Sequence, residues 1–191
     1  METAALPPPP APQCQCLRGA APSKRPPLPP CTESLTAGGL ALLGMGLLTG
    51  LHYSTPLQRS GLGLAFGSLA ASAALMYAAP AAPLAQPRNV IGGHVVSAAI
   101  GVAMRVLVAD SGAPGALPAA AALAVGLAVA AMAACGVQHP AGGGTAFLAV
   151  ASPDAVAMGW LFLPSIALGA GILVAVALVG NFLGRPYPQW W

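Results

Sequence analysis

The chain has 191 residues, of which 57% are hydrophobic and 6% are charged, and its formal net charge is +3. About a quarter of the residues in an ordinary soluble domain are charged. The composition therefore excludes a water-soluble globular enzyme, a nucleic-acid-binding domain and a coiled coil, and it predicts an integral membrane protein.

The first 33 residues form a region of their own, because ten of them are proline. Proline at this density prevents helix formation and favours extended polyproline II or disorder. We therefore predict a disordered Pro-rich tail over residues 1–33. The low acid content also fits a plastid transit segment, and residues 24–30 match a proline-rich ligand pattern; these alternatives stay open.

Five apolar segments follow in a predicted transmembrane domain at 34–183. A membrane span needs about 20 apolar residues, and the segments fall at 35–51, 61–79, 90–109, 117–137 and 156–182. A glycine-rich interruption at 138–145 and an apolar piece at 146–151, too short to span, precede the last segment. The predicted fold class is all-α: a polytopic transmembrane helix bundle with five hydrophobic segments, or with four true spans plus an interfacial or re-entrant one.

The basic residues predict how the bundle is oriented. With five crossings, the basic residues of the tail and Arg88 lie on one side, whereas Arg59 and Arg185 lie on the other. Because Lys and Arg concentrate on the cytoplasmic side, we expect the N-terminus to face the cytosol or the stroma. Residues 184–191 are predicted to form an interfacial aromatic C-terminus, since tyrosine and tryptophan favour the membrane interface.

Two glycine-rich stretches, at 86–94 and 138–146, carry the features of a polar site. Each contains Gln, Pro, adjoining glycines and a histidine, and each follows an even-numbered segment, so both face the same side. A helix N-terminus favours an anion, and glycine lets backbone N–H groups approach it. The predicted anion site comprises Arg88, Asn89, Gly92, Gly93, His94, His139, Gly142, Gly143, Gly144 and Thr145, with Arg105 as a secondary contact.

Several of these residues also have purely structural interpretations, which stay open. Arg88 is equally explained as an interfacial anchor, and Arg105 as a side chain that reaches the interface beside Asp110. The glycines at 142–144 would also suit a tight turn. The histidines would also serve as hydrogen-bonding groups between helices.

Residues 80–94 resemble the signature of the HPP family of integral membrane proteins, and residues 139–146 resemble the motif that names the family. Two positions of the second motif differ from the family's pattern: Ala141 replaces the second proline, and Gly144 stands where alanine is expected. The resemblance extends over residues 35–183 and implies four transmembrane helices. Plant members are associated with nitrite transport, so it also implies a nitrite transporter of the chloroplast membrane.

The leading functional hypothesis is thus a transporter or channel for a small inorganic anion, first of all nitrite, embedded in the lipid bilayer. The alternative is a non-transporting membrane assembly or interaction protein that docks through its Pro-rich tail. The sequence offers no nucleophile–histidine motif, zinc motif or intramembrane carboxylate pair, so we expect no enzyme, no cofactor and no metal. Small residues at Gly93, Ser97 and Gly101 favour close helix packing, and assembly into a homo-oligomer stays open.

Overall fold

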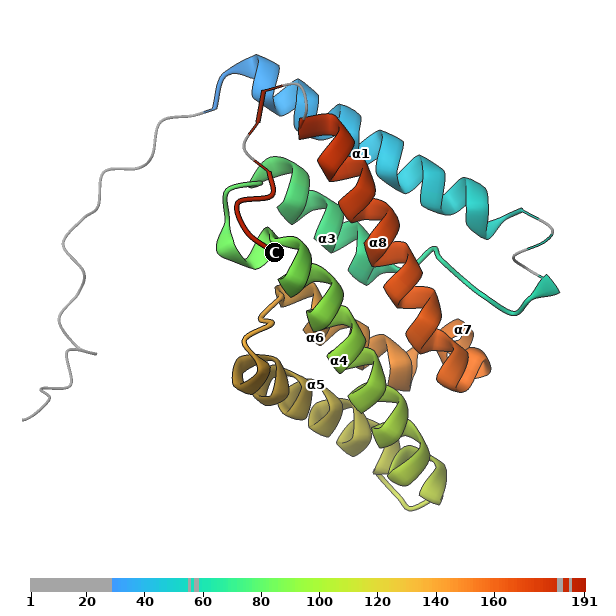
Figure 1. Cartoon of the computed structure of the whole chain (residues 1–191). Helices are drawn as coiled ribbons and strands as arrows, with labels where there is room; N and C mark the ends of the chain where they lie inside the picture. The colour runs from blue at the N-terminus through green and yellow to red at the C-terminus, as the bar shows by residue number, and fades with distance from the viewer. Residues whose placement is uncertain (1–28, 55, 57–58, 182–183, 186) are drawn as a thin grey trace, which may run out of the picture.

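The computed structural model describes residues 29–54, 56, 59–181, 184–185 and 187–191, and their regular elements are all helical (Figure 1). The α-helices are α1 (Cys31–His52), α3 (Gly67–Ala78), α4 (Pro87–Leu107), α5 (Ala116–Cys135), α6 (Pro140–Ala151), α7 (Pro153–Met158) and α8 (Phe162–Asn181). Short 3₁₀ turns lie at η2 (Pro83–Ala85), η3 (Ala109–Ser111) and η4 (Gly159–Leu161). Most of the predicted tail lies outside the described residues.

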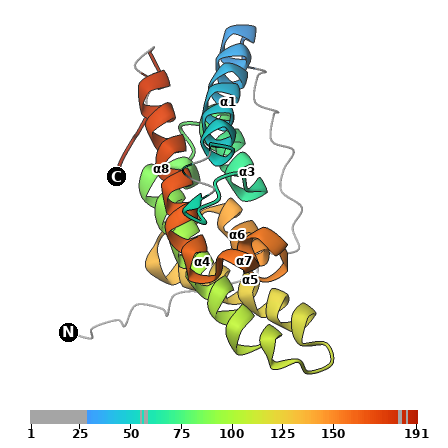
Figure 2. The same ribbon diagram turned by 90° about the vertical axis from the view of Figure 1, so that its right-hand side faces the viewer.

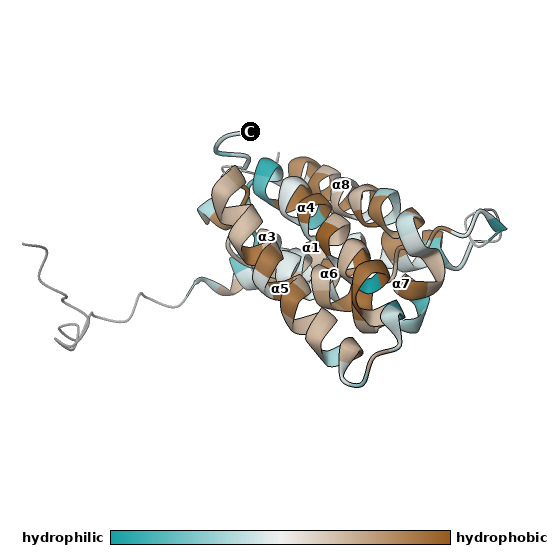
Figure 3. Cartoon of the chain, turned by 90° about the horizontal axis from the view of Figure 1, so that it is seen from below, coloured by the Kyte–Doolittle hydropathy of each residue, from teal (hydrophilic) through white to brown (hydrophobic). Residues whose placement is uncertain are grey.

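Four stretches of the described chain are long and apolar enough to cross a membrane: Cys31–His52, Pro87–Ser111, Ala116–Cys135 and Pro153–Gly180. Large apolar side chains such as Leu42, Leu123 and Leu168 are exposed, and the ribbon of Figure 3 is coloured hydrophobic over much of the length of the helices. The prediction of an all-α transmembrane bundle is confirmed, and the four candidate spans agree with its alternative of four true spans plus one further segment.

The segment predicted at 61–79 is the one that falls short. Helix α3 has 12 residues, about 18 Å at 1.5 Å per residue, against the roughly 30 Å of hydrocarbon in a bilayer. The chain before it is not helical: Gly61 has a φ of 74°, and the Leu64 N–H donates to Nδ1 of His52 over 3.2 Å. The His52 side chain thus accepts the hydrogen bond from the Leu64 N–H, which a backbone carbonyl would accept in a helix.

The interruption predicted at 138–145 exists but is shorter, because α5 ends at Cys135 and α6 begins at Pro140 and continues through all three glycines. Proline suits the first position of a helix, where its missing N–H is not needed. Glycine lowers helix propensity by about 1 kcal/mol relative to alanine. Close packing against α4 offsets this cost, and α6 becomes a second helix of 12 residues.

Helix α6 changes the course of the chain. It runs parallel to α4: a Cβ at Gly93 would meet His139, a Cβ at Gly101 would meet Ala149, and Nη1 of Arg105 donates to the Val150 carbonyl. Helix α8 therefore starts at the far end of the bundle and returns to the end where α1 begins, as Figure 1 shows.

The C-terminal segment consequently packs beside the loop that precedes α4. Nη1 of Arg185 donates to the Tyr77 carbonyl over 2.8 Å, and the Gln189 N–H donates to Oε1 of Gln86 over 2.8 Å. The prediction that Arg185 lies on the side opposite Arg88 was wrong, because it did not count α6 as a further passage of the chain.

Two packed cores hold the bundle together. The larger one joins α1, α3, α4 and α8 through residues such as Leu48, Met76 and Leu173. The smaller one joins α5 and α6 through alanines such as Ala124 and Ala146. Figure 2 shows α4 and α6 between α5 and the α1–α8 pair.

Candidate functional site

Four polar side chains from three helices meet inside the bundle. Ser72 comes from α3, His94 from α4, His139 from the N-cap of α6, and Thr145 from α6 itself. The exposed fraction is 0% for Ser72, His94 and Thr145 and 1% for His139. These four residues are called the histidine cluster below.

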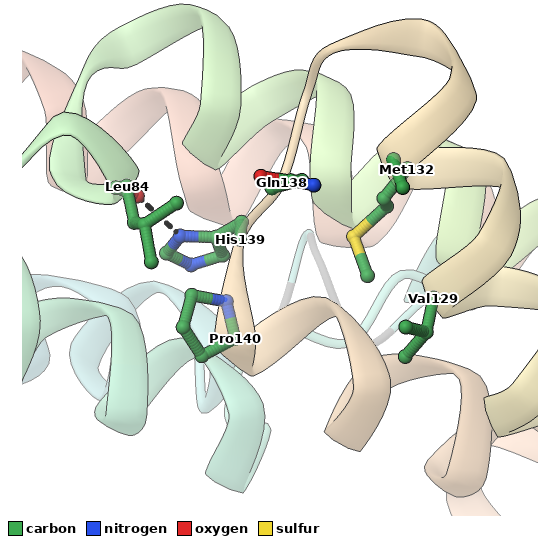
Figure 4. Close-up of a pocket in the computed structure, with 7 residues that line it drawn as sticks. Leu84, Val129, Met132, Gln138, His139 and Pro140 are labelled. Carbon is green, nitrogen blue, oxygen red and sulfur yellow. Dashed lines mark hydrogen bonds between the residues drawn. The ribbon is translucent and has the colours of Figure 1, made fainter. Parts of the chain in front are cut away.

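Ser72 joins the two histidines. Its Oγ lies 2.7 Å from Nε2 of His94 and 2.8 Å from Nε2 of His139. At the other edge of the rings, Nδ1 of His94 lies 2.6 Å from Oγ1 of Thr145. Nδ1 of His139 lies 2.9 Å from the Leu84 carbonyl oxygen, the bond drawn in Figure 4. The ring centroids are 5.1 Å apart.

The Leu84 carbonyl fixes where the protons sit when both rings are neutral. A carbonyl only accepts, so Nδ1 of His139 carries the hydrogen and its Nε2 accepts from the Ser72 hydroxyl. The Ser72 oxygen then accepts from Nε2–H of His94, and Nδ1 of His94 accepts from the Thr145 hydroxyl. This assignment, inferred from the network, makes one continuous hydrogen-bond chain from Thr145 to Leu84.

The loop before α4 holds the Leu84 carbonyl in position. Gln86 is fully buried, and its Nε2 donates to the carbonyls of Pro80 and Ala82, both over 3.0 Å. Asn89, a predicted site residue, donates from Nδ2 to the Pro83 carbonyl over 3.1 Å. Asn89 therefore braces this loop and has no hydrogen bond to the histidine cluster.

Three of the predicted glycines bring α4, α6 and the segment between α5 and α6 into close contact. A Cβ at Gly93 would lie 2.6 Å from Cβ of His139, and one at Gly92 would lie 2.9 Å from Cγ1 of Val137. A Cβ at Gly142 would lie 2.7 Å from Oγ of Ser97. These positions require glycine because backbones and side chains approach there too closely for a larger residue.

The remaining glycines are less restricted. The nearest atoms to a Cβ at Gly143 and Gly144 would be 3.9 and 3.7 Å away, which is ordinary contact. Gly92 and Gly93 lie inside α4, which begins at Pro87, so they do not form its N-terminal end. The Gly142 N–H donates to the His139 carbonyl over 2.9 Å.

The two predicted arginines make contacts outside the cluster. Arg88 is exposed, and its Nη2 donates to the Cys135 carbonyl over 3.4 Å at the C-terminus of α5, where the helix dipole favours a cation. Nε of Arg105 lies 2.8 Å from Oδ1 of Asp110, and its Nη1 lies 3.2 Å from the Val150 carbonyl oxygen. Of the predicted residues, the structure thus brings His94, His139 and Thr145 together.

Sequence reasoning missed Ser72 and the Leu84 carbonyl. Ser68 and Ser72 are the polar side chains of α3 besides the Tyr77 hydroxyl, and their spacing of four places both on one helix face. That pattern in an otherwise apolar helix was the available signal. Backbone carbonyls such as that of Leu84 leave no signal in a sequence.

Two open grooves flank the start of α6. One, about 270 Å³, is lined by His139 and Pro140 together with Leu84, Val129, Met132, Ala133 and Gln138 (Figure 4). The other, about 420 Å³, lies between α3 and α6 and is lined by Pro140 together with Gly67, Ser68, Ala71, Leu75, Ala141 and Gly144. His139 thus connects the histidine cluster to the first groove, whereas none of the four cluster residues lines the second.

Long apolar helices around a buried polar cluster define a polytopic helical membrane protein. The family described as HPP, transmembrane region, matches residues 26–188, and the chain belongs to this family. Two curated relatives are transmembrane proteins of Dictyostelium discoideum. One is 38% identical over 154 residues, covering 79% of this chain and 49% of the relative.

The second relative is 36% identical over 176 residues, covering 91% of this chain and 61% of the relative. The chain thus spans about half to three fifths of the length of these two proteins. No solved structure matches the chain.

Proposed function

We propose that this chain moves a small inorganic anion across the membrane and that the histidine cluster is the polar site on the anion's path. The observation that carries the proposal is the convergence of two buried histidine Nε2 atoms on Ser72 inside an apolar bundle. Polar groups at membrane depth are costly, and they commonly mark substrate or ion pathways.

The two short helices support this assignment. Helices α3 and α6 are each about 18 Å long, so neither extends across the hydrocarbon by itself. Helices that end at membrane depth are a recurrent way to build a substrate site in transporters. The groove that His139 lines gives a small solute an approach to the cluster.

Nitrite is the first substrate to test, because the resemblance to plant family members implies it, and a chloroplast membrane is the location that goes with it. Imidazole N–H groups and hydroxyls are suitable donors for a small oxyanion. The proposed contacts are therefore His94, His139 and Thr145, each of which would exchange a hydrogen bond within the cluster for one to the anion. Arg88 and the glycine-rich helix starts have other contacts, described above.

The test is anion uptake into proteoliposomes containing the full chain, with nitrite, nitrate and chloride compared. His94→Ala and His139→Ala each remove one ring. Because a hydrogen bond to a charged group contributes about 1.5–3 kcal/mol, uptake should fall roughly tenfold or more. His52→Ala is the matched control, since His52 bonds to Leu64 outside the cluster, and its uptake should match wild type.

Two outcomes would overturn the proposal. Wild-type uptake in both His94→Ala and His139→Ala would show that neither histidine contacts the transported anion. No uptake of any of the three anions by the wild-type chain would favour the alternative of a non-transporting membrane assembly or interaction protein.

A further inference from the structure

We infer that the histidine cluster takes up one proton with each anion, so that the chain is an electroneutral symporter of one proton and one anion. The inference rests on the proposed function and deepens it by assigning a proton site and a stoichiometry. It is carried by the hydrogen-bond geometry of two hydroxyl groups and by the absence of a carboxylate beside the rings in the part of the chain that the structure describes.

Each hydroxyl of the cluster has a second acceptor within reach. Ser72 Oγ lies 3.1 Å from the Ser68 carbonyl oxygen, and Thr145 Oγ1 lies 3.3 Å from the Ala141 carbonyl oxygen. In the neutral chain both hydroxyl hydrogens point to histidine nitrogens. The two carbonyls are therefore spare acceptors toward which the hydroxyls are able to rotate.

These spare acceptors allow one ring to be protonated without leaving a polar group unpaired. A proton added to Nδ1 of His94 forms an N–H bond that donates to the Thr145 oxygen. The Thr145 hydroxyl then rotates to the Ala141 carbonyl. A proton added to Nε2 of His139 is accommodated in the same way, with the Ser72 hydroxyl rotating to the Ser68 carbonyl.

The charge is able to pass from one ring to the other through Ser72. The N–H bond at Nε2 of protonated His94 breaks as its proton forms an O–H bond on Ser72. The original Ser72 O–H bond breaks as its proton forms an N–H bond at Nε2 of His139. Two bonds break and two form, His94 becomes neutral with its hydrogen on Nδ1, and His139 becomes the cation.

The geometry favours a single proton. With ring centroids 5.1 Å apart, two imidazolium groups would repel each other in a site of low dielectric constant. A single imidazolium, by contrast, keeps all its hydrogen bonds in the arrangements described above. The cluster thus alternates between a neutral state and a state of charge +1.

Among the described residues, no protein anion faces the charged state. The titratable and charged groups on the surrounding elements have other partners or are exposed. They are Cys31, Glu33 and His52 on α1, Tyr77 on α3, Arg88 and Arg105 on α4, Asp110 on η3, Cys135 on α5, and Arg185 and Tyr187 in the C-terminal segment. Helices α6 and α8 carry none, and Asp154 on α7 lines a separate groove beside His52. An imidazolium in the cluster therefore requires the transported anion as its counter-ion.

The experiment measures proton and nitrite uptake together in proteoliposomes that contain the full chain and a pH-sensitive dye. Valinomycin and potassium set the membrane potential independently of the pH gradient, and protein-free vesicles correct for passive entry of nitrous acid. We expect an inside-alkaline gradient to drive nitrite uptake, one proton to enter per nitrite, and the membrane potential to have no effect.

The possible failures are distinguishable. Nitrite uptake that follows the membrane potential and ignores the pH gradient would overturn proton coupling and leave the proposed anion transport in place. No protein-dependent nitrite uptake under either gradient would overturn the proposed function, and the inference with it.

Variants at Thr145 test the coupling separately from folding. Thr145→Val keeps the side-chain shape but removes the hydroxyl, and uptake driven by the pH gradient should fall about tenfold. Thr145→Ser keeps the hydroxyl and should restore both the rate and the one-to-one ratio. A Thr145→Val protein with wild-type rate and ratio would overturn the assignment, and so would a Thr145→Ser protein that is folded but uncoupled.

Discussion

The outer helices α1 and α5 differ from the inner helices α3, α4, α6 and α8 in whether they bury polar side chains. Helix α1 buries Leu40, Gly44 and Leu48, and α5 buries alanines and Met132, so neither buries a polar side chain. The buried polar residues described lie on α3, α4, α6 and α8 or at helix N-caps: Ser68, Ser72, Gln86, Asn89, His94, Ser97, His139, Thr145 and Ser165. The outer helices α1 and α5 thus need only lipid and apolar neighbours, whereas the inner helices, the long α4 and α8 included, bring polar groups that need partners.

This difference has a consequence for mutation. Substitutions on the outer face of α5 meet lipid and should be tolerated. Substitutions where α3, α4 and α6 touch should disturb packing or leave a buried polar atom unpaired. We therefore expect larger losses of stability at the contacts among α3, α4 and α6 than on the outer face of α5.

The largest loss of stability is expected where α4 touches α6. Gly101→Leu places a side chain where even a Cβ would lie 2.6 Å from Cβ of Ala149 and 2.7 Å from the Ala146 carbonyl oxygen. Overpacking of this kind costs about 1–3 kcal/mol and sometimes more. The measurement is the yield of monodisperse protein and its melting temperature in detergent.

Gly126→Leu in α5 is the matched control, because no atom lies within 4 Å of a Cβ there. It should purify and melt like the wild-type chain. Equal stability of the Gly101 and Gly126 variants would contradict the close α4–α6 contact.

A smaller loss is expected from Ser72→Ala, which deprives the two histidines of their common partner. The expected loss of stability is about 1–3 kcal/mol, the cost of leaving a buried polar group unpaired. Ser165→Ala is the control, since Ser165 is equally buried but its hydroxyl has no hydrogen-bond partner among the described residues. Thermal unfolding in detergent should show a lower melting temperature for Ser72→Ala and an unchanged one for Ser165→Ala. The reverse result would argue against the hydrogen bonds from Ser72 to the two histidines.

The C-terminal segment should contribute less. The Tyr187 hydroxyl donates to the Ala85 carbonyl over 3.1 Å, so Tyr187→Phe should cost about 0.5–1.5 kcal/mol. Burial, and secondarily the charge of Tyr77, raises the pKa of Tyr187. A raised pKa keeps the folded state protonated, so this contribution is present below the ordinary tyrosine pKa of about 10 and is lost as the pH rises above it.

The measurement for this prediction is the melting temperature as a function of pH. The wild-type chain should lose more stability above about pH 10 than Tyr187→Phe does. Identical alkaline profiles would show that the phenol does not form the buried hydrogen bond.

The smallest effect is expected at Arg88. Its side chain is exposed and donates to the Cys135 carbonyl at the end of α5, an interaction worth about 0.3–1 kcal/mol. Arg88→Gln should therefore keep most of its stability and most of its anion uptake. A loss of uptake as large as in His94→Ala would indicate that Arg88 contacts the anion and would argue against the histidine cluster as the principal anion site.

Much of the fold follows from composition and hydrophobic length. The long segments that became α1, α4, α5 and α8 needed only counts of apolar residues, and the two motifs were sufficient to indicate the family. The limits of α3 and α6 did not follow, because His52 takes a backbone donor from Leu64 and because packing against α4 outweighs the low helix propensity of three glycines. These are tertiary effects, which override local preference.

The site was only partly predictable for the same reason. His94 and His139 carry recognisable motifs, whereas Ser72 reaches them across 22 and 67 residues of sequence. Arg88 was predicted as a site residue because it is a cation beside a glycine-rich stretch. The position of its guanidinium depends instead on the Cys135 carbonyl at the end of α5. Local sequence does not contain that information.

The most direct test of the joined histidines is nitrogen NMR of the full chain in lipid bilayers, with ¹⁵N-labelled histidine and assignment by His→Gln variants. At neutral pH we expect two neutral rings with opposite tautomers: the hydrogen on Nδ1 in His139 and on Nε2 in His94. Ser72→Ala should shift both signals and leave that of His52 unchanged. The same tautomer in both rings, or histidine signals that do not change in Ser72→Ala, would contradict the hydrogen-bonded arrangement of the two rings.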